Sequence, residues 1–191
     1  MKKIALLLLL AASFSMPAFA ADGAEPIKLI SYNLRTSHGK DGDNVWMKRR
    51  HATPEMIRRE APDVFGVQEG LIDQLHYIDA ECPQYARVGV GRDDGAEKGE
   101  FMAVYYLRDR FELLDSGTFW LSETPDKVSR GWDGACNRTV TWVELKDRKS
   151  GKEFFYFNTH LDHKGKGATM LILGAILMIV CHLTFAFVLP E

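Results

Sequence analysis

The sequence predicts an α/β protein with mixed sheets, because two strand–helix units come first and a series of short strands follows them. Residues 27–34 roughly alternate between apolar and polar side chains, which predicts a strand. Residues 63–69 form a short apolar stretch ending in Glu69, which predicts a second, buried strand. A helical pattern follows each strand, so we expect helices to cover one face of a sheet.

The remaining elements follow from periodicity and turn residues. Residues 47–60 place apolar side chains among charges, which predicts one amphipathic helix, with Thr53-Pro54 as a local start signal and Pro62 after its end. Residues 70–80 predict a second helix. The later strands are predicted at 85–90, 101–107, 111–121, 138–146 and 153–160, with turn residues at 91–95 and 150–151 between them.

The start of the chain is typical of a secretory signal peptide. A basic segment, Met1 to Lys3, precedes the apolar residues 4–10 and a small-x-small cleavage site at 18–20. We therefore expect residues 1–20 to be removed and the protein to be exported, to a periplasm or the exterior; an uncleaved anchor is the alternative. The loss of two lysines from 24 basic against 26 acidic residues leaves a net charge of −4. Such a balance excludes a broad basic face for nucleic acid.

The end of the chain differs in composition from the rest. Residues 167–190 contain no Lys, Arg, Asp or Glu, and about 20 apolar residues are enough to span a bilayer. Lys164 and Lys166 precede this segment and only Glu191 follows it, which is the reverse of the positive-inside tendency for an exported domain. We favour an aberrant tail, produced by a frameshift or truncation at Lys166. A transmembrane helix that anchors the domain, and an interfacial or core helix, are the alternatives.

Between these ends, residues 21–166 have the length of one domain. This part contains two of the three cysteines, Cys82 and Cys136. An exported protein can join such a pair in a disulfide, but sequence alone cannot assign the pairing, and two free thiols fit equally well.

Polar side chains gather at the predicted strand ends. Asn33 and Glu69 close the first two strands, Glu100 precedes a later one, and Asn158 and His160 end the last. Strand ends meet at one rim of an open α/β sheet, where ligands bind. Carboxylate and amide oxygens suit Mg²⁺, Mn²⁺ or Ca²⁺, and a His beside a carboxylate can stay protonated and donate to a phosphoryl oxygen. The alternative is that these side chains are polar because they face water.

These segments resemble the endonuclease/exonuclease/phosphatase superfamily, whose fold is that of deoxyribonuclease I. The similarity covers about residues 27–166, a little over half of a superfamily domain, and two of its segments resemble the exported bacterial branch in particular. The matching segments are 31–35, Trp46 with Arg49, 62–70 and 158–163, and those of the bacterial branch are 89–95 and 116–125.

The resemblance implies a deoxyribonuclease I-like four-layer α/β/β/α sandwich, incomplete here and followed by the C-terminal hydrophobic helix at 167–190. We expect the second sheet to come largely from the part of the domain that is absent. The first sheet would then expose an apolar face and open edges, which favours aggregation.

The resemblance also assigns the site residues. Glu69 is similar to the principal metal-binding carboxylate and Asn33 to the amide that completes a site for Mg²⁺, Mn²⁺ or Ca²⁺. His160 resembles the catalytic histidine that contacts the scissile phosphate, with Glu100 as its acidic partner.

Two further residues are predicted to bind substrate. Arg138 resembles a phosphate-contacting arginine, a role that suits the fixed fork of donors of a guanidinium, and Asn158 precedes the histidine in the same motif. Glu100 as part of a solvated loop and Arg138 as a structural residue are the competing interpretations.

The implied function is that of an exported, metal-dependent hydrolase of phosphodiesters or phosphomonoesters. The superfamily's Gly-Asp-x-Asn and terminal Ser-Asp-His motifs do not occur after residue 163, so we expect impaired activity. The alternative is a non-catalytic remnant or a membrane-tethered phosphate-binding module.

The expected substrate is a small phosphodiester, a phospholipid head group, a sugar phosphate or a nucleic acid. The acidic net charge argues against long nucleic acid, whose binding depends on many basic side chains. We expect a monomer, with membrane contact through 167–190 if that segment is an anchor.

Overall fold

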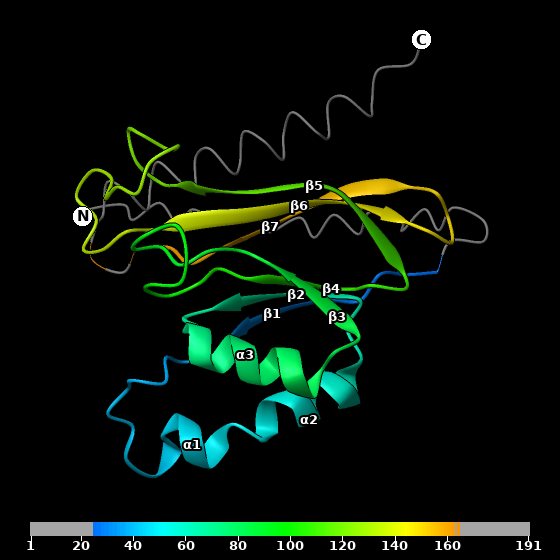
Figure 1. The fold of residues 1–191 in the computed structure, drawn as a ribbon, viewed down its shortest axis with the longest axis horizontal. Coiled ribbons are helices and arrows are strands. Elements are labelled where there is room, and N and C mark those ends of the chain that lie inside the picture. The colour runs from blue at the N-terminus through cyan, green and yellow to red at the C-terminus, as the bar shows by residue number, and fades with distance from the viewer. Residues whose placement is uncertain (1–24, 163, 165–191) are drawn as a thin grey trace, which may run out of the picture.

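The computed structural model describes residues 25–162 and 164, so the predicted signal peptide and the apolar segment 167–190 lie outside the described residues. Within them the helices lie on one side of a four-stranded sheet and a three-stranded sheet lies on the other (Figure 1). The elements in chain order are β1 (Leu29–Asn33), the 3-10 helix η1 (Gly42–Asn44), α1 (Trp46–Arg49), α2 (Ala52–Glu60), β2 (Val64–Gln68), α3 (Ile72–Glu81), β3 (Tyr85–Val88), β4 (Val104–Leu107), β5 (Phe111–Trp120), β6 (Thr139–Asp147) and β7 (Glu153–Thr159).

The four-stranded sheet has the order β1-β2-β4-β3, with β1 and β2 parallel and the other neighbours antiparallel. Every residue of β2 is buried, because helices cover one face of this strand and the second sheet covers the other. On the helix side, Ile57 of α2 and Leu75 of α3 pack with Phe65 of β2. The Phe65 ring stacks on Tyr105 of β4 at a centroid distance of 4.6 Å.

The three-stranded sheet, β5-β6-β7, is antiparallel and packs face to face on the first. Val104 and Tyr106 of β4 meet Phe111, Val143 and Leu145 of the second sheet in one buried cluster. The expectation that the second sheet is largely absent is therefore wrong. Residues 111–159 form three paired strands, and the apolar face of the first sheet is covered.

The exposed apolar surface lies instead on the outer face of the second sheet. Phe155 and Phe157 of β7 are 54% and 51% exposed, and the Phe155 ring lies 6.0 Å from Trp142 and 6.2 Å from Phe157. Among residues 25–162 no helix covers this face. Aromatic side chains therefore make up the exposed apolar surface of this sheet.

Two predicted elements are wrong in their extent. The helix expected at 47–60 is two helices, α1 and α2, that meet at Arg50 and His51. Pro54 accounts for the break, because it has no N–H to donate and its ring clashes with the carbonyl four residues earlier, that of Arg50. The strand expected at 101–107 begins only at Val104, and Phe101 makes isolated bridges to Gly70 and Gly91.

Cys82 and Cys136 are free thiols, so the disulfide alternative does not hold in this structure. Cys82 is buried at the end of α3, within the core between the helices and the first sheet. In the part of the chain that is described, no helix is long and apolar enough to cross a membrane.

A buried ion cluster joins the two sheets at the edge opposite the strand ends that carry Asn33 and Glu69. The Arg110 guanidinium lies 2.6 Å from the Asp63 carboxylate and 3.3 Å from that of Asp147, and all three side chains are nearly buried. Asp63 also accepts a hydrogen bond from the Lys28 N–H at 2.7 Å.

We expect Arg110→Ala to lower the free energy of unfolding by about 3–5 kcal/mol, because it leaves two buried carboxylates without their cation. Urea unfolding measures this. Arg148→Ala, which breaks an ion pair about half exposed on both sides, is the control and should cost less than about 1 kcal/mol. Equal losses in the two variants would contradict the assignment.

Candidate active site

Asn33 and Glu69 come together because β1 and β2 are parallel neighbours. Asn33 pairs in register with Gln68, so Glu69 follows directly at the same rim. The Asn33 side-chain amide donates to Glu69 Oε1 at 2.9 Å, and the Arg35 N–H donates to Asn33 Oδ1 at 2.8 Å. Glu69 and Arg35 have φ angles of +58° and +55°, a left-handed conformation that costs roughly 1 kcal/mol for such residues and is frequent at functional sites.

The surroundings of Glu69 keep it ionised. Burial alone would raise the pKa of its carboxyl group, but hydrogen bonds from Asn33 and from the backbone of Thr36 lower it. The nearby charges of His160 and Arg35 act in the same direction, and the net result is a lowered pKa. Glu69 is therefore a carboxylate at neutral pH.

This carboxylate fits a hard divalent cation, because an ionised oxygen ligand at a partly open rim is what Mg²⁺ takes together with several waters. Asn33 turns its amide nitrogen toward Glu69 and its oxygen toward the Arg35 N–H, so in this conformation it orients the carboxylate. No cluster of three or more His, Cys, Asp or Glu side chains that could hold a metal ion lies among the described residues. A cation at this rim would take Glu69 as its main ligand, with Asn33 beside it.

His160 follows the end of β7 and faces Glu69. Its Nε2 lies 3.9 Å from Glu69 Oε1, and its Nδ1 lies 3.3 Å from Arg138 Nη1. Because a guanidinium only donates, Nδ1 accepts this hydrogen bond and the neutral ring carries its proton on Nε2. The Nε2–H donor therefore points toward the carboxylate rim.

The expectation that a neighbouring carboxylate keeps His160 protonated is wrong in direction. Burial and the positive charge of Arg138 lower the pKa of His160, and they outweigh Glu69 and Glu100, whose negative charges raise it. At neutral pH the ring is a neutral hydrogen-bond donor.

Arg138 is 6% exposed and immediately precedes β6. Besides its contact with His160, its Nε lies 3.5 Å from Asp162 Oδ2. Asp162 is itself buried and accepts backbone hydrogen bonds from Ala135 at 2.9 Å and Lys164 at 2.7 Å. The sequence analysis placed Asp162 within the segment 158–163 that resembles the superfamily but assigned it no role.

Glu100 lies on the loop before β4 and pairs with Arg92 Nη1 at 2.5 Å. The same loop is tied to the second sheet, since Trp120 Nε1 donates to the Arg92 carbonyl at 2.8 Å and Asn137 donates to it at 3.2 Å. Glu100 is close enough for its charge to raise the pKa of His160. Its role as acidic partner of that histidine stays a prediction.

Asn158 lies below the rim, 4% exposed. Its amide nitrogen donates to the carbonyls of Val67 and Ala103, both at 2.8 Å, and its oxygen accepts from Gln68 at 2.6 Å. These contacts use the side chain to join the two sheets. The structure therefore gives Asn158 a structural place beneath the site, instead of the predicted place in contact with substrate.

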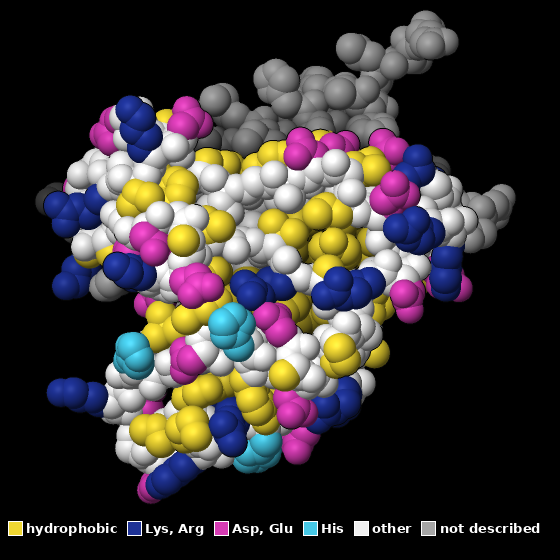
Figure 2. Space-filling view, viewed as in Figure 1, with side chains coloured by type: hydrophobic (Ala, Val, Ile, Leu, Met, Phe, Trp, Pro, Cys, Tyr) yellow, Lys and Arg dark blue, Asp and Glu magenta, His cyan; other side chains and the backbone are white. Residues whose placement is uncertain are grey.

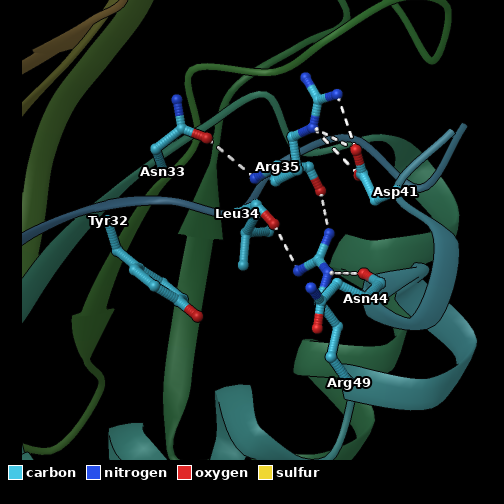
Figure 3. A pocket seen from close by; sticks show the side chains of 7 residues that line it. All are labelled: Tyr32, Asn33, Leu34, Arg35, Asp41, Asn44 and Arg49. Atoms are coloured by element: carbon cyan, nitrogen blue, oxygen red, sulfur yellow. Dashed lines mark hydrogen bonds and ion pairs between the residues drawn. The ribbon is translucent and has the colours of Figure 1, made fainter. Parts of the chain in front are cut away.

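An open pocket adjoins the rim that carries Asn33 (Figure 3). Arg49, one of the residues that carry the family resemblance, donates to the carbonyls of Leu34, Arg35 and Asn44 and so fixes the chain around it. The Arg35 guanidinium pairs with the Asp41 carboxylate at 2.9 Å on the other side. The pocket lies beside Asn33 and could take the part of a substrate that extends from the rim.

Solved structures of similar proteins share this fold. An endonuclease/exonuclease/phosphatase from Bacteroides vulgatus is 40% identical, with a TM-score of 0.74, over 81% of this chain and 61% of that chain. A mannosyl-6-phosphatase from Bacteroides thetaiotaomicron is 38% identical, with a TM-score of 0.75, over 81% of this chain and 60% of that chain. Both matches confirm the predicted deoxyribonuclease I-like fold.

The curated relatives give less information. An uncharacterized protein of Acanthamoeba polyphaga mimivirus is 26% identical over 124 residues, 61% of this chain and 46% of that protein. No protein-family model matches. The chain spans about half the length of that relative and about 60% of the two Bacteroides structures.

We expect Asn158→Ala to lower the free energy of unfolding by about 3 kcal/mol or more, because two buried carbonyls and the Gln68 amide lose their partner. Chemical denaturation measures the change. Asn44→Ala, at an exposed position on the pocket rim, should change it by less than about 0.5 kcal/mol. A stability like that of the unmodified protein would show that Asn158 does not join the sheets.

We expect Arg138→Met to raise the pKa of His160 toward its ordinary value of 6.5, because a positive charge that opposes the imidazolium is removed. An NMR titration of the histidine ring measures this. Arg130→Met removes an exposed arginine of the segment between β5 and β6 and should leave the pKa of His160 unchanged. A lower pKa in Arg138→Met would overturn the assigned cause.

Proposed function

Since this chain belongs to the endonuclease/exonuclease/phosphatase superfamily, we propose that it is a metal-dependent phosphoesterase that works after export from the cytoplasm. The observation that carries the proposal is the convergence of Glu69, His160 and Arg138 at one rim. They lie next to the ends of three different strands, and contacts of 3.9 Å between Glu69 and His160 and 3.3 Å between His160 and Arg138 join them.

In this proposal Glu69 holds a divalent cation, and Asn33 keeps its carboxylate turned toward the rim. When bound there, the cation supplies the positive charge that polarises a phosphoryl oxygen. The Nε2–H of His160 donates to an oxygen of the same phosphate. The Arg138 guanidinium holds Nδ1 of the ring and adds a fixed positive charge beside the developing negative charge.

We propose a small phosphate ester, in particular a sugar phosphate, as the substrate. The relative from Bacteroides thetaiotaomicron is a mannosyl-6-phosphatase and is 38% identical. On the face drawn in Figure 2, acidic and basic side chains are interspersed and no broad basic area is present among the described residues. A surface of this kind favours a small substrate over a nucleic acid.

The second candidate is a phosphate-binding module without turnover. It is favoured by the surroundings of Glu69, since no cluster of three or more His, Cys, Asp or Glu side chains that could hold a metal ion lies among the described residues.

We expect Glu69→Gln to lower kcat/KM for mannose 6-phosphate and for an aryl phosphodiester by about a hundredfold or more with Mg²⁺ or Mn²⁺. The variant keeps the shape of the side chain and loses the charge that binds the cation. Glu55→Gln, exposed on α2, is the matched control and should match the unmodified protein.

The same assay separates the two candidates. Turnover that disappears in Glu69→Gln supports the enzyme. If no variant hydrolyses either ester while the unmodified protein binds inorganic phosphate in calorimetry, the binding module is correct. Turnover that survives in Glu69→Gln would rule out this site as its origin.

A further inference from the structure

We propose that Asp162 is a positioning residue of the site, which holds Arg138 and, through it, sets the tautomer of His160. The proposal rests on the proposed function, because it takes Arg138 and His160 as parts of the phosphate site. It starts from an unusual arrangement, in which a carboxylate side chain only 1% exposed lies directly behind the arginine.

Asp162 fixes Arg138 in two ways. Its Oδ2 accepts the Ala135 N–H at 2.9 Å, which holds the backbone of the loop that leads into β6. The same oxygen lies 3.5 Å from Arg138 Nε, so it also holds the guanidinium. Its other oxygen accepts the Lys164 N–H at 2.7 Å. One carboxylate therefore holds the backbone before Arg138, the side chain of Arg138 and the chain after His160.

The loop before Arg138 lies against this carboxylate, since a Cβ added at Gly134 would be in ordinary contact with Asp162 Oδ2, at 3.7 Å. We infer that the direction of the Arg138 side chain is fixed by the carboxylate behind it.

Arg138 acts on the His160 tautomer through its hydrogen bond to the ring. Arg138 Nη1 lies 3.3 Å from His160 Nδ1, and because the guanidinium can only donate, it leaves the ring proton on Nε2. If Arg138 is released, Nδ1 loses this donor and can carry the proton itself. Nε2 would then be unable to donate to a phosphate at the rim.

The test is Asp162→Asn, which keeps the size of the side chain but removes its charge. At pH 8, where His160 is neutral, we expect ¹⁵N NMR of the His160 ring to change from the Nε2–H tautomer to a mixture. The affinity for inorganic phosphate should fall on the order of tenfold, the scale of outer hydrogen-bond partners in other sites.

A matched control is available in the same protein. Asp147 is also a buried carboxylate that accepts a backbone N–H, from Lys149 at 2.8 Å, and pairs with an arginine, Arg110 at 3.3 Å, away from the site. Asp147→Asn should lower stability in a similar way without changing the His160 tautomer. An unchanged tautomer in Asp162→Asn, or an equal change in Asp147→Asn, overturns the proposal.

If Asp162→Asn does not fold, Arg138→Lys tests the same dependence of the His160 tautomer on Asp162 and Arg138. Lysine keeps the charge but lacks the planar fork whose Nε forms the ion pair with Asp162 and whose Nη1 donates to His160 Nδ1. The tautomer should therefore again become mixed, and an unchanged tautomer overturns the proposal. These spectra need no catalysis. A protein that hydrolyses no ester can still show that Asp162 and Arg138 set the tautomer of His160. An active protein can still show that they do not.

Discussion

The packing of the Asn158 side chain between the two sheets is the contact on which the geometry of the site depends. Its amide binds two backbone carbonyls of the first sheet, and Gln68 donates to its oxygen. Glu69 follows Gln68 on the first sheet, and His160 lies two residues after Asn158 on the second. The buried Asn158 amide therefore sets the distance between Glu69 and His160. Gly66 permits this approach, because a Cβ there would lie 2.7 Å from the Asn158 amide carbon. Because protein interiors are closely packed, the Asn158 side chain needs the space that the absent Cβ of Gly66 leaves.

Above this contact, charge alternates along the rim. The ionised Glu69 lies on one side of His160 and the Arg138 guanidinium on the other, with the Asp162 carboxylate behind Arg138. Partial burial makes these interactions stronger than they would be in water. The alternation explains why a histidine beside a carboxylate is nevertheless neutral. The arginine is as near as the carboxylate, and burial adds to its effect.

The meeting of Asn33 and Glu69 could be predicted from sequence, because parallel strands end at the same edge and each strand was visible as a pattern. The contact of Arg138 with His160 depends on the register of β6 with β7, in which Val140 pairs with Thr159, and no local pattern encodes that register. Asn158 shows a related difficulty. A polar residue at a strand end can face water or the core, and only the opposite sheet decides which.

The expectation that the second sheet is largely absent was wrong because it rested on motifs of the superfamily and not on the strands that the sequence predicts after residue 110. Residues 111–159 supply three of them, and this sheet carries Arg138 and His160 to the rim that Glu69 reaches from the first sheet. The described residues therefore bring together the groups that, in the proposed function, hold and orient a phosphate. Hydrolysis needs a further group that takes a proton from the attacking water. Phosphate binding and hydrolysis are therefore separable properties of the proposed site, because only hydrolysis requires that further group.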